Sequence, residues 1–242
     1  MLEVKNVSMV FGGLVALNKV NLKVKKGEIR GLIGPNGSGK TTMINVITGF
    51  YNPTSGDVTF KGTNISKYAP YNICRKGLVR TFQNINLFPQ MTALENVLTG
   101  YSSRMKSSFP GTIFNLKSFK QEEKLYMDMA DEIIKFVGLN GKENTKACNL
   151  PYGQQRLLEI GRALATKPEL ILLDEPVAGM NDQESDEVAI LVKKLQQNDI
   201  TVLLIEHHMR FVMNLCEKVT VFNSGAVIAE GSPKEIQNNE EV

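Results

Sequence analysis

The sequence predicts an α/β fold in which a mostly parallel β-sheet is covered by helices. Three observations lead to this prediction. Strand-type and helix-type segments alternate through the last third of the chain, a glycine-rich loop joins an early strand to a helix, and an apolar strand ends in two acidic residues. Because parallel strands need a crossover connection, which is usually a helix, such alternation is typical of a parallel sheet.

The first sixty residues indicate short strands. Val20, Leu22 and Val24 alternate with polar residues, which is the period-two pattern of a half-buried strand. Residues 58–60 repeat this pattern in a shorter form. Residues 28–33 lead into the glycine-rich loop, so we expect a strand there as well.

The middle of the chain indicates helices. Residues 41–48 predict a helix directly after the loop, and residues 118–137 predict a longer one. Ser118 and Gln121 would form a capping box at the start of the longer helix, and Gly138 would end it. Its apolar residues are expected on one face: Leu125, Met129, Ile133 and Phe136.

The last third of the chain alternates strand and helix. Residues 170–173 and 201–205 are apolar runs that predict buried strands. The helix between them begins near Asn181 and Glu184. Its buried face is expected to hold Val188, Leu191, Val192 and Leu195. Residues 219–229 predict a β-hairpin around an Asn-Ser-Gly turn.

The composition is ordinary for a globular protein of 242 residues, with 42% apolar residues, 22% charged residues and a formal net charge of +3. This small charge indicates neither nucleic acid nor an anionic membrane as a partner. The apolar runs are far shorter than the about 20 residues of a membrane-spanning helix. Three widely spaced cysteines, Cys74, Cys148 and Cys216, and an N-terminus unlike a signal peptide favour a reducing cytosolic setting.

The glycine-rich loop of residues 34–41, Gly-Pro-Asn-Gly-Ser-Gly-Lys-Thr, matches the P-loop pattern. Glycines let backbone N–H groups point at phosphate oxygens, and the following helix adds its positive end. Lys40 would bring a positive charge to the β- and γ-phosphates, and the Thr41 hydroxyl would ligate Mg²⁺. The predicted nucleotide-binding residues here are Asn36, Gly37, Ser38, Gly39, Lys40, Thr41 and Thr42. A chance glycine-rich turn is the alternative, which the strand–loop–helix context disfavours.

Two acids, Asp174 and Glu175, follow the apolar strand at residues 170–173. Ligands of parallel α/β sheets lie at the carboxyl ends of the strands. We therefore expect Asp174 to face Mg²⁺ held by Thr41, and Glu175 to polarise a water that attacks the γ-phosphate. Two solvated acids after a core strand are the alternative, and the P-loop makes it the weaker one.

With these residues the chain resembles the ATP-binding cassette (ABC) ATPases, and further positions match that family in order along nearly the whole chain. Phe11 resembles the aromatic residue that stacks on adenine, and Gln83 the loop glutamine that contacts Mg²⁺ and the attacking water. His207 resembles the histidine that contacts the γ-phosphate. Taken singly, Phe11 could be a core residue, Gln83 a surface amide and His207 a helix cap, and the neighbouring His208 could be mistaken for His207.

Residues 150–154, Leu-Pro-Tyr-Gly-Gln, lie where the family has its signature loop, and the resemblance implies that Gly153 and Gln154 bind nucleotide. The usual sequence is Leu-Ser-Gly-Gly-Gln. Pro151 therefore lacks the serine hydroxyl, and Tyr152 restricts the backbone where the family has glycine. These departures concern the contact that the signature loop of one cassette makes with the phosphates bound by a second cassette. They leave the nucleotide site of Lys40, Asp174 and Glu175 unchanged.

The resemblance also implies a role for each site residue. The implied catalytic residues are Glu175, His207 and Gln83, and the implied metal ligands are Thr41, Gln83 and Asp174. In the loop after the acids, residues 178–181, Asn181 replaces the family's aspartate, which keeps hydrogen bonding and removes a charge. ATP and Mg²⁺ are the implied ligands.

The resemblance implies a P-loop NTPase core with a mostly parallel sheet, an N-terminal antiparallel β-subdomain and a helical subdomain. One ABC ATPase domain would span residues 1–242. Residues 1–84 and 160–242 would form the catalytic core, and residues 85–159 the helical subdomain with the signature loop.

Within this family the chain looks most like the ATP-binding subunit of high-affinity branched-chain amino-acid importers. The shared stretches are residues 10–13, 47–53, 79–83 and 205–207, a signature-loop tyrosine and a long insertion at residues 101–119, whose composition is typical of a loop. The resemblance implies a head-to-tail dimer of identical or similar cassettes. Two membrane permease subunits, served by a solute-binding protein, would dock near Gln83 and residues 84–96.

Such a subunit would lie peripherally on the cytoplasmic face of the plasma membrane and bind no nucleic acid. Two other interpretations keep the fold: a cassette for lipid or lipopolysaccharide export, and a soluble ABC ATPase of translation or DNA repair. Soluble relatives usually have two cassettes, long coiled coils or basic patches, which this sequence lacks. A regulatory module without catalysis would have lost the general base, and Glu175 is present.

Overall fold

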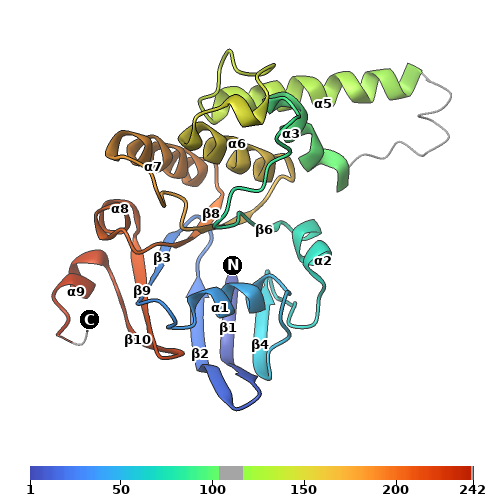
Figure 1. Ribbon diagram of the computed structural model, residues 1–242. Coiled ribbons are helices and arrows are strands. Elements are labelled where there is room, and N and C mark those ends of the chain that lie inside the picture. Colours follow the sequence, from blue (N-terminus) through green and yellow to red (C-terminus); the bar gives the residue numbers. More distant parts are fainter. Residues whose placement is uncertain (104–116, 241) are drawn as a thin grey trace. The chain divides into compact units, whose positions relative to one another are not determined.

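The computed structural model describes residues 1–103, 117–240 and 242, and side chains outside residues 103–121 and 241 (Figure 1). The residues form two compact units, which are described separately. Unit 1 comprises residues 1–83 and 169–242, and unit 2 comprises residues 84–168. Unit 1 carries the two β-sheets, whereas the longer elements of unit 2 are helices.

The larger sheet of unit 1 has six strands in the order β10-β9-β3-β8-β7-β6. The strands are β3 (Ile29–Ile33), β6 (Leu78–Arg80), β7 (Leu170–Asp174), β8 (Thr201–Ile205), β9 (Lys218–Asn223) and β10 (Ala226–Gly231). Only β10 runs antiparallel to its neighbour, and the other pairs are parallel. The predicted α/β fold with a mostly parallel sheet is therefore confirmed.

The three central strands explain why the sequence contains short apolar runs. Every residue of β3, β7 and β8 is buried. Parallel strands are typically covered on both faces, and here these strands share a core with the antiparallel sheet of unit 1. The register pairs Leu32 of β3 and Asp174 of β7 with the same residue, Ile205 of β8. The carboxyl ends of these strands consequently lie level at one edge of the sheet.

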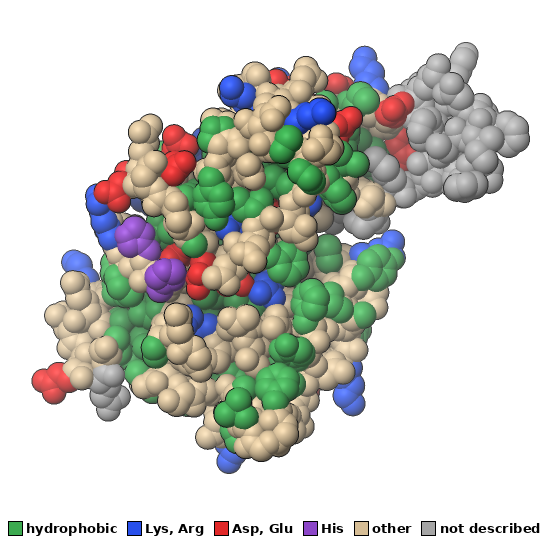
Figure 2. Space-filling model, viewed as in Figure 1, with side chains coloured by type: hydrophobic (Ala, Val, Ile, Leu, Met, Phe, Trp, Pro, Cys, Tyr) green, Lys and Arg blue, Asp and Glu red, His purple; other side chains and the backbone are tan. Residues whose placement is uncertain are grey.

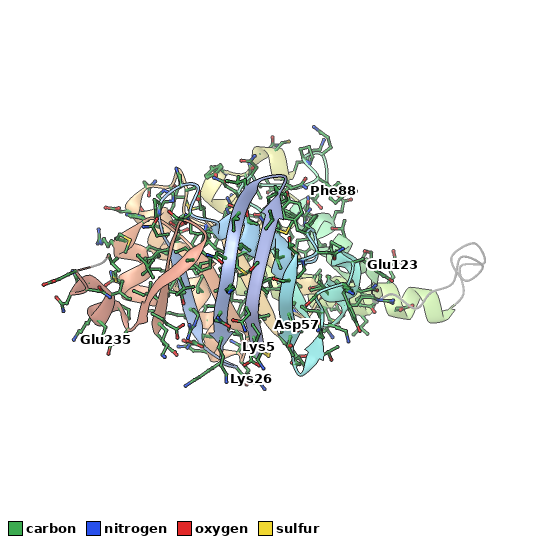
Figure 3. All side chains as sticks on the ribbon, turned by 90° about the horizontal axis from the view of Figure 1, so that it is seen from below. Lys5, Lys26, Asp57, Phe88, Glu123 and Glu235 are labelled. Carbon is green, nitrogen blue, oxygen red and sulfur yellow. The ribbon has the colours of Figure 1, made fainter. Side chains whose placement is uncertain are left out.

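The second sheet of unit 1 is antiparallel, in the order β2-β1-β4-β5. Its strands are β1 (Leu2–Phe11), β2 (Leu14–Val24), β4 (Ser55–Phe60) and β5 (Thr63–Asn64), and Figure 3 shows β1 and β2 side by side. The predicted alternation on β2 is confirmed, since Val20, Leu22 and Val24 are all buried. They share a core with Met43 and Ile44 of the helix that follows the P-loop.

The helices of unit 1 are α1 (Lys40–Ile47), α2 (Pro70–Arg75), α7 (Asp182–Gln197), α8 (Met209–Leu215) and α9 (Pro233–Gln237). The predicted start of α7 is confirmed: the Asn181 side chain accepts from the backbone N–H of Glu184, and the Glu184 carboxylate accepts from that of Asn181. Its predicted apolar face is buried. The turn of the β9–β10 hairpin has positive φ at Ser224 and Gly225, which matches the tight turn expected there.

Unit 2 contains α3 (Ala93–Gly100), the short 3₁₀ turns η1 (Tyr101–Ser103) and η2 (Ala147–Asn149), α5 (Lys117–Phe136) and α6 (Tyr152–Ala165). The predicted loop or insertion at residues 101–119 falls mainly on residues 104–116, which lie outside the described residues. The predicted capping box of Ser118 and Gln121 lies outside the described side chains.

The four apolar residues predicted on one face of α5 differ in burial. Leu125 is 56% exposed, whereas Met129, Ile133 and Phe136 are half-buried. The described side chains of the helix that are fully buried are those of Ala130 and Ile134, one position further along than Met129 and Ile133. The helix packs against α3 and α6, and Gly161 of α6 lets Val137 and Ile133 approach closely. Periodicity identified the helix, whereas its neighbours determine which stripe is buried.

Among the residues that the structure describes, no helix combines the length and apolarity needed to cross a membrane.

Candidate nucleotide site

The candidate site lies at the carboxyl ends of four parallel strands of unit 1. The P-loop follows β3, Gln83 lies just beyond β6, Glu175 follows β7, and His207 lies just beyond β8. Because these strands are parallel neighbours, residues distant in the sequence come to one edge of the sheet. This edge is where open α/β sheets bind their ligands.

Two glycines give the P-loop its shape. Gly34 has φ 147°, and a Cβ atom there would lie 2.2 Å from the Phe222 carbonyl oxygen. Gly39 has φ 102°, and its Cβ would lie 2.8 Å from the Ala16 carbonyl oxygen. Only glycine fits both the conformation and the space. The loop is therefore held close against β9 and β2.

Lys40 places a positive charge inside this loop. Its Nζ donates to the carbonyl oxygens of Gly34 and Pro35, each at 2.8 Å. Burial lowers the pKa of Lys40, while the negative charges of Glu175 and Asp174 act in the opposite direction. An anion bound in the loop would compensate the desolvated ammonium group, so the pocket is suited to phosphate.

The other predicted residues of the P-loop lie around this ammonium group. Asn36 and Gly37 are exposed at the tip, and Ser38 is buried. Thr41 is exposed on the first turn of α1, and the N-cap of α1 lacks a side-chain hydrogen bond. The start of α1 can therefore offer backbone N–H groups to an anion. Thr42 is half-buried beside it.

Asp174 is buried at the end of β7 and forms an ion pair with Arg80. Arg80 is not among the predicted site residues. The Arg80 guanidinium donates to Asp174 Oδ2 at 2.7 Å and to Asn45 Oδ1 of α1 at 2.6 Å. It also lies over the Phe82 ring, 5.1 Å from the centroid. Arg80 therefore links the predicted metal carboxylate to the P-loop helix and to the residue before Gln83.

The three predicted catalytic side chains come together. Gln83 Nε2 donates to Glu175 Oε2 at 2.9 Å, and His207 Nδ1 lies 3.7 Å from Glu175 Oε1. The Glu175 backbone has φ 48°, which is uncommon for a residue other than glycine, and its N–H donates to the Ile205 carbonyl oxygen at 2.9 Å. Such backbone strain persists only where the surroundings fix it, and it clusters at functional sites.

The two histidines of the chain differ in their surroundings. His208 is the N-cap residue of α8 and lines a groove of about 530 Å³ between α7 and α8. His207 instead faces Glu175. Figure 2 shows both imidazoles (purple) next to acidic side chains (red). The geometry therefore favours His207 over His208 for a contact with the γ-phosphate.

Phe11, the predicted adenine platform, ends β1 with a partly exposed ring. It contacts Tyr51 edge-to-face, with a centroid distance of 5.3 Å. Such aromatic pairs are stabilising beyond the area that they bury. Tyr51 was not predicted as part of the site, and it fixes the orientation of the ring on which a base could stack.

The signature loop lies in unit 2. Pro151 is the N-cap of α6 and provides no side-chain hydrogen bond, and Tyr152 begins the helix with a largely exposed side chain. Gly153 is buried and Gln154 half-buried in the first turn. This helix start retains backbone N–H groups that can face a phosphate even though the serine of the usual signature is missing.

We expect the Arg80→Ala variant to lower the free energy of unfolding by about 3 kcal/mol, because it leaves the buried Asp174 carboxylate without its charged partner. Urea unfolding followed by circular dichroism would measure this loss, since the chain has no tryptophan. Arg75→Ala is the matched control, because Arg75 is exposed on α2. Equal losses in both variants would contradict the role given to Arg80.

The sequence of residues 17–178 matches the protein family described as ABC transporter. The chain therefore belongs to the ABC transporter family and is an ATP-binding cassette ATPase. The protein named high-affinity branched-chain amino acid transport ATP-binding protein BraF, from Pseudomonas aeruginosa, is 44% identical over 242 residues, covering 100% of this chain and 95% of the relative.

Solved structures agree with this assignment. A nucleotide-free ATP-binding cassette from an ABC transporter superposes with a TM-score of 0.87 at 36% identity, covering 100% of this chain and 96% of that one. The cassette MJ0796, in a dimeric post-hydrolysis state bound to ADP and phosphate, gives a TM-score of 0.81 at 28% identity, covering 96% and 99% of the two chains. The fold is thus one that binds nucleotide.

Proposed function

We propose that this chain is the subunit that binds and hydrolyses ATP to drive import of branched-chain or related amino acids through separate membrane subunits. The proposed ATP hydrolysis is supported by one observation. Glu175, Gln83 and His207 form a cluster beside the lysine of the P-loop. The solute is proposed from the name of the 44% identical relative. The cytoplasmic face of the membrane is the proposed location.

Mg²⁺ is the proposed metal, and the residues at the site suit it. Thr41 and Asp174 offer oxygen ligands, as does the amide of Gln83, and Mg²⁺ prefers oxygen. Within the described part of the chain, no three His, Cys, Asp or Glu side chains could hold a metal by themselves. Mg²⁺ usually takes only one or two protein ligands and completes its shell with phosphates and water. When bound, it would neutralise phosphate charge.

In the proposed reaction, Glu175 accepts a proton from a water whose oxygen forms a bond to the γ-phosphorus. The bond from that phosphorus to the bridging oxygen breaks, which gives ADP and phosphate. Gln83 and His207 orient the water and the γ-phosphate, and Lys40 balances charge on the β- and γ-phosphates. Catalysis by this chain would thus consist of positioning and electrostatic stabilisation.

We further propose that the working unit is a head-to-tail dimer. Gly153 and Gln154 at the start of α6 would face the ATP held by the P-loop of a partner cassette, either a second copy or a similar chain. The dimeric structure of MJ0796, bound to ADP and phosphate, supports a dimeric working unit. Enclosing ATP between two cassettes would exclude all water except the attacking one.

Residues 84–96 are the proposed docking surface for the membrane subunits. Phe88 is exposed there, and Leu87 is half-buried. Asn96 is fully buried and accepts from the Phe88 N–H at 2.9 Å, while its amide donates to the Phe88 carbonyl at 3.0 Å. The backbone that presents Phe88 is therefore fixed within unit 2, as a docking surface requires.

Substitution of Leu87 and Phe88 by serine is expected to uncouple ATP hydrolysis from transport. The purified cassette should retain its ATPase activity, whereas uptake of labelled leucine by the reconstituted complex should fall to background. Leu125→Ser is the matched control, because Leu125 is another exposed apolar residue of unit 2 and lies outside residues 84–96. Unchanged uptake in the double variant would remove this surface from the proposal.

The solute needs its own test. Purification of the complex from its native membrane should yield two membrane subunits with many spans, and the reconstituted complex should accumulate labelled leucine, isoleucine or valine when ATP is present. Accumulation of none of these amino acids or their close analogues would overturn the proposed solute class. It would leave the ATPase assignment intact.

A further inference from the structure

A buried carboxylate that has been given no role lies next to the catalytic cluster. Glu206 follows β8 and immediately precedes His207. Its side chain is 1% exposed and forms no ion pair with another residue that the structure describes. A buried charge is costly unless hydrogen bonds compensate it, so its surroundings require an explanation.

Three backbone N–H groups surround this carboxylate. Oε2 accepts from the N–H groups of His207 at 3.0 Å and His208 at 3.1 Å. Oε1 accepts from the N–H of Val177 at 3.2 Å. Hydrogen bonds from backbone N–H groups to an ionised carboxylate are among the stronger ones, and they stabilise its charged form.

These bonds join two segments that the reaction needs. Oε2 of Glu206 accepts from the turn that contains His207, and Oε1 accepts from the loop that follows Glu175. Val177 lies two residues after Glu175, and the intervening Pro176 has no N–H to donate. Two hydrogen bonds therefore connect the ends of β7 and β8 and the loops that follow them. The first runs from the Glu175 N–H to the Ile205 carbonyl oxygen, and the second from the Val177 N–H to the Glu206 carboxylate.

The hydrogen bond from the Val177 N–H to Glu206 matters because the backbone of Glu175 is strained. Glu175 has φ 48°, a strained conformation that persists only where the surrounding structure holds it. The nearest backbone N–H after Glu175 is that of Val177, and it is the one fixed by Glu206. Glu206 therefore acts on the position of both Glu175 and His207, whose side chains lie 3.7 Å apart.

We propose that Glu206 is a positioning residue for ATP hydrolysis: its buried carboxylate fixes the loops of Glu175 and His207 in one geometry. This inference rests on the proposed ATPase mechanism. Because Glu206 is buried, it would not reach the nucleotide, and its loss should lower kcat and leave ATP affinity unchanged. A residue that only stabilises the fold would not separate these two quantities.

The Glu206→Gln variant tests this inference, because it keeps the shape and replaces one of the two acceptor oxygens by an NH₂ group. That group would face either the Val177 N–H or the two histidine N–H groups. We expect kcat to fall about 10- to 100-fold, since small displacements of catalytic groups have effects of this size. The dissociation constant for ATP, measured by calorimetry, should stay within about twofold, well below one tenfold step of affinity.

Glu28→Gln is the matched control, because Glu28 is another buried glutamate of unit 1 that accepts from a backbone N–H and lies outside the site. It should lose stability in urea unfolding and keep its kcat. An unchanged kcat in Glu206→Gln, or a fall that Glu28→Gln reproduces, would overturn the inference. If Glu206→Gln does not fold, Glu206→Asp carries the same test, since its shorter side chain keeps the charge and cannot reach both loops.

Wild type and Glu175→Gln are assayed in the same series. Activity in wild type and its loss in Glu175→Gln would keep the proposed mechanism, and Glu206→Gln then decides the inference alone. An active Glu175→Gln variant would instead overturn the mechanism on which the inference rests.

Discussion

The Glu175→Gln variant is expected to bind ATP as tightly as the wild type and to hydrolyse it about 100- to 10,000-fold more slowly, the range for loss of a general base. Glutamine keeps the size and the hydrogen bond to Gln83 but cannot accept a proton from water. Glu175 lies at the end of a central strand with Gln83 at 2.9 Å and His207 at 3.7 Å, so the variant changes only the chemistry of this cluster.

Phosphate release would measure turnover, and calorimetry with ATP would measure binding. Glu187→Gln is the control, because Glu187 is exposed on α7 away from the cluster. The variant should also accumulate as an ATP-bound dimer in size-exclusion chromatography, since neither cassette then consumes the ATP held by its own P-loop. Hydrolysis at the wild-type rate would remove Glu175 from its role as general base.

The sequence predicted those parts of the site whose residues are neighbours in the chain. The P-loop with Lys40 is one contiguous motif, and Asp174 and Glu175 end one apolar strand, so spacing alone was informative. Arg80 and Glu206 were not predicted as functional. The partners of Arg80 lie on α1 and β7, and those of Glu206 include Val177 on another loop. Only the parallel order of the strands brings these groups together.

The sequence nevertheless contains a pattern that could have identified both residues as functional. Arg80 and Glu206 are charged residues at the ends of apolar strands, where burial is expected. A charged side chain that the sequence pattern places in the core needs a polar or charged partner. If that side chain lies at the carboxyl ends of parallel strands, its partner lies close to the ligand site. The face of α5 had no such signal. Apolar residues occupy adjacent stripes of that helix, and the full burial of Ala130 and Ile134 results from packing against α3 and α6.

Lys40→Met is expected to weaken ATP binding about 10- to 100-fold, which corresponds to the about 1.5–3 kcal/mol of a hydrogen bond to a charged group. Methionine fills most of the lysine's volume without its charge. The loop should keep its fold, because Gly34 and Gly39 are fixed by their backbone neighbours and the Ser38 carbonyl accepts from the Gly225 N–H at 2.9 Å. The loss should therefore appear in the dissociation constant for ATP and not in the free energy of unfolding.

The pH dependence of binding gives an independent check on the same residue. Burial lowers the pKa of Lys40 below its ordinary value, so the free cassette loses this charge earlier than an exposed lysine would as the pH rises. Phosphates bind the protonated form, and ATP affinity of the wild type should consequently fall as the pH rises through that lowered pKa. Lys40→Met should show no such fall, whereas Lys26→Met, at an exposed position of unit 1, should behave as the wild type does. Parallel pH profiles for Lys40→Met and wild type would show that the buried ammonium group does not bind the phosphates.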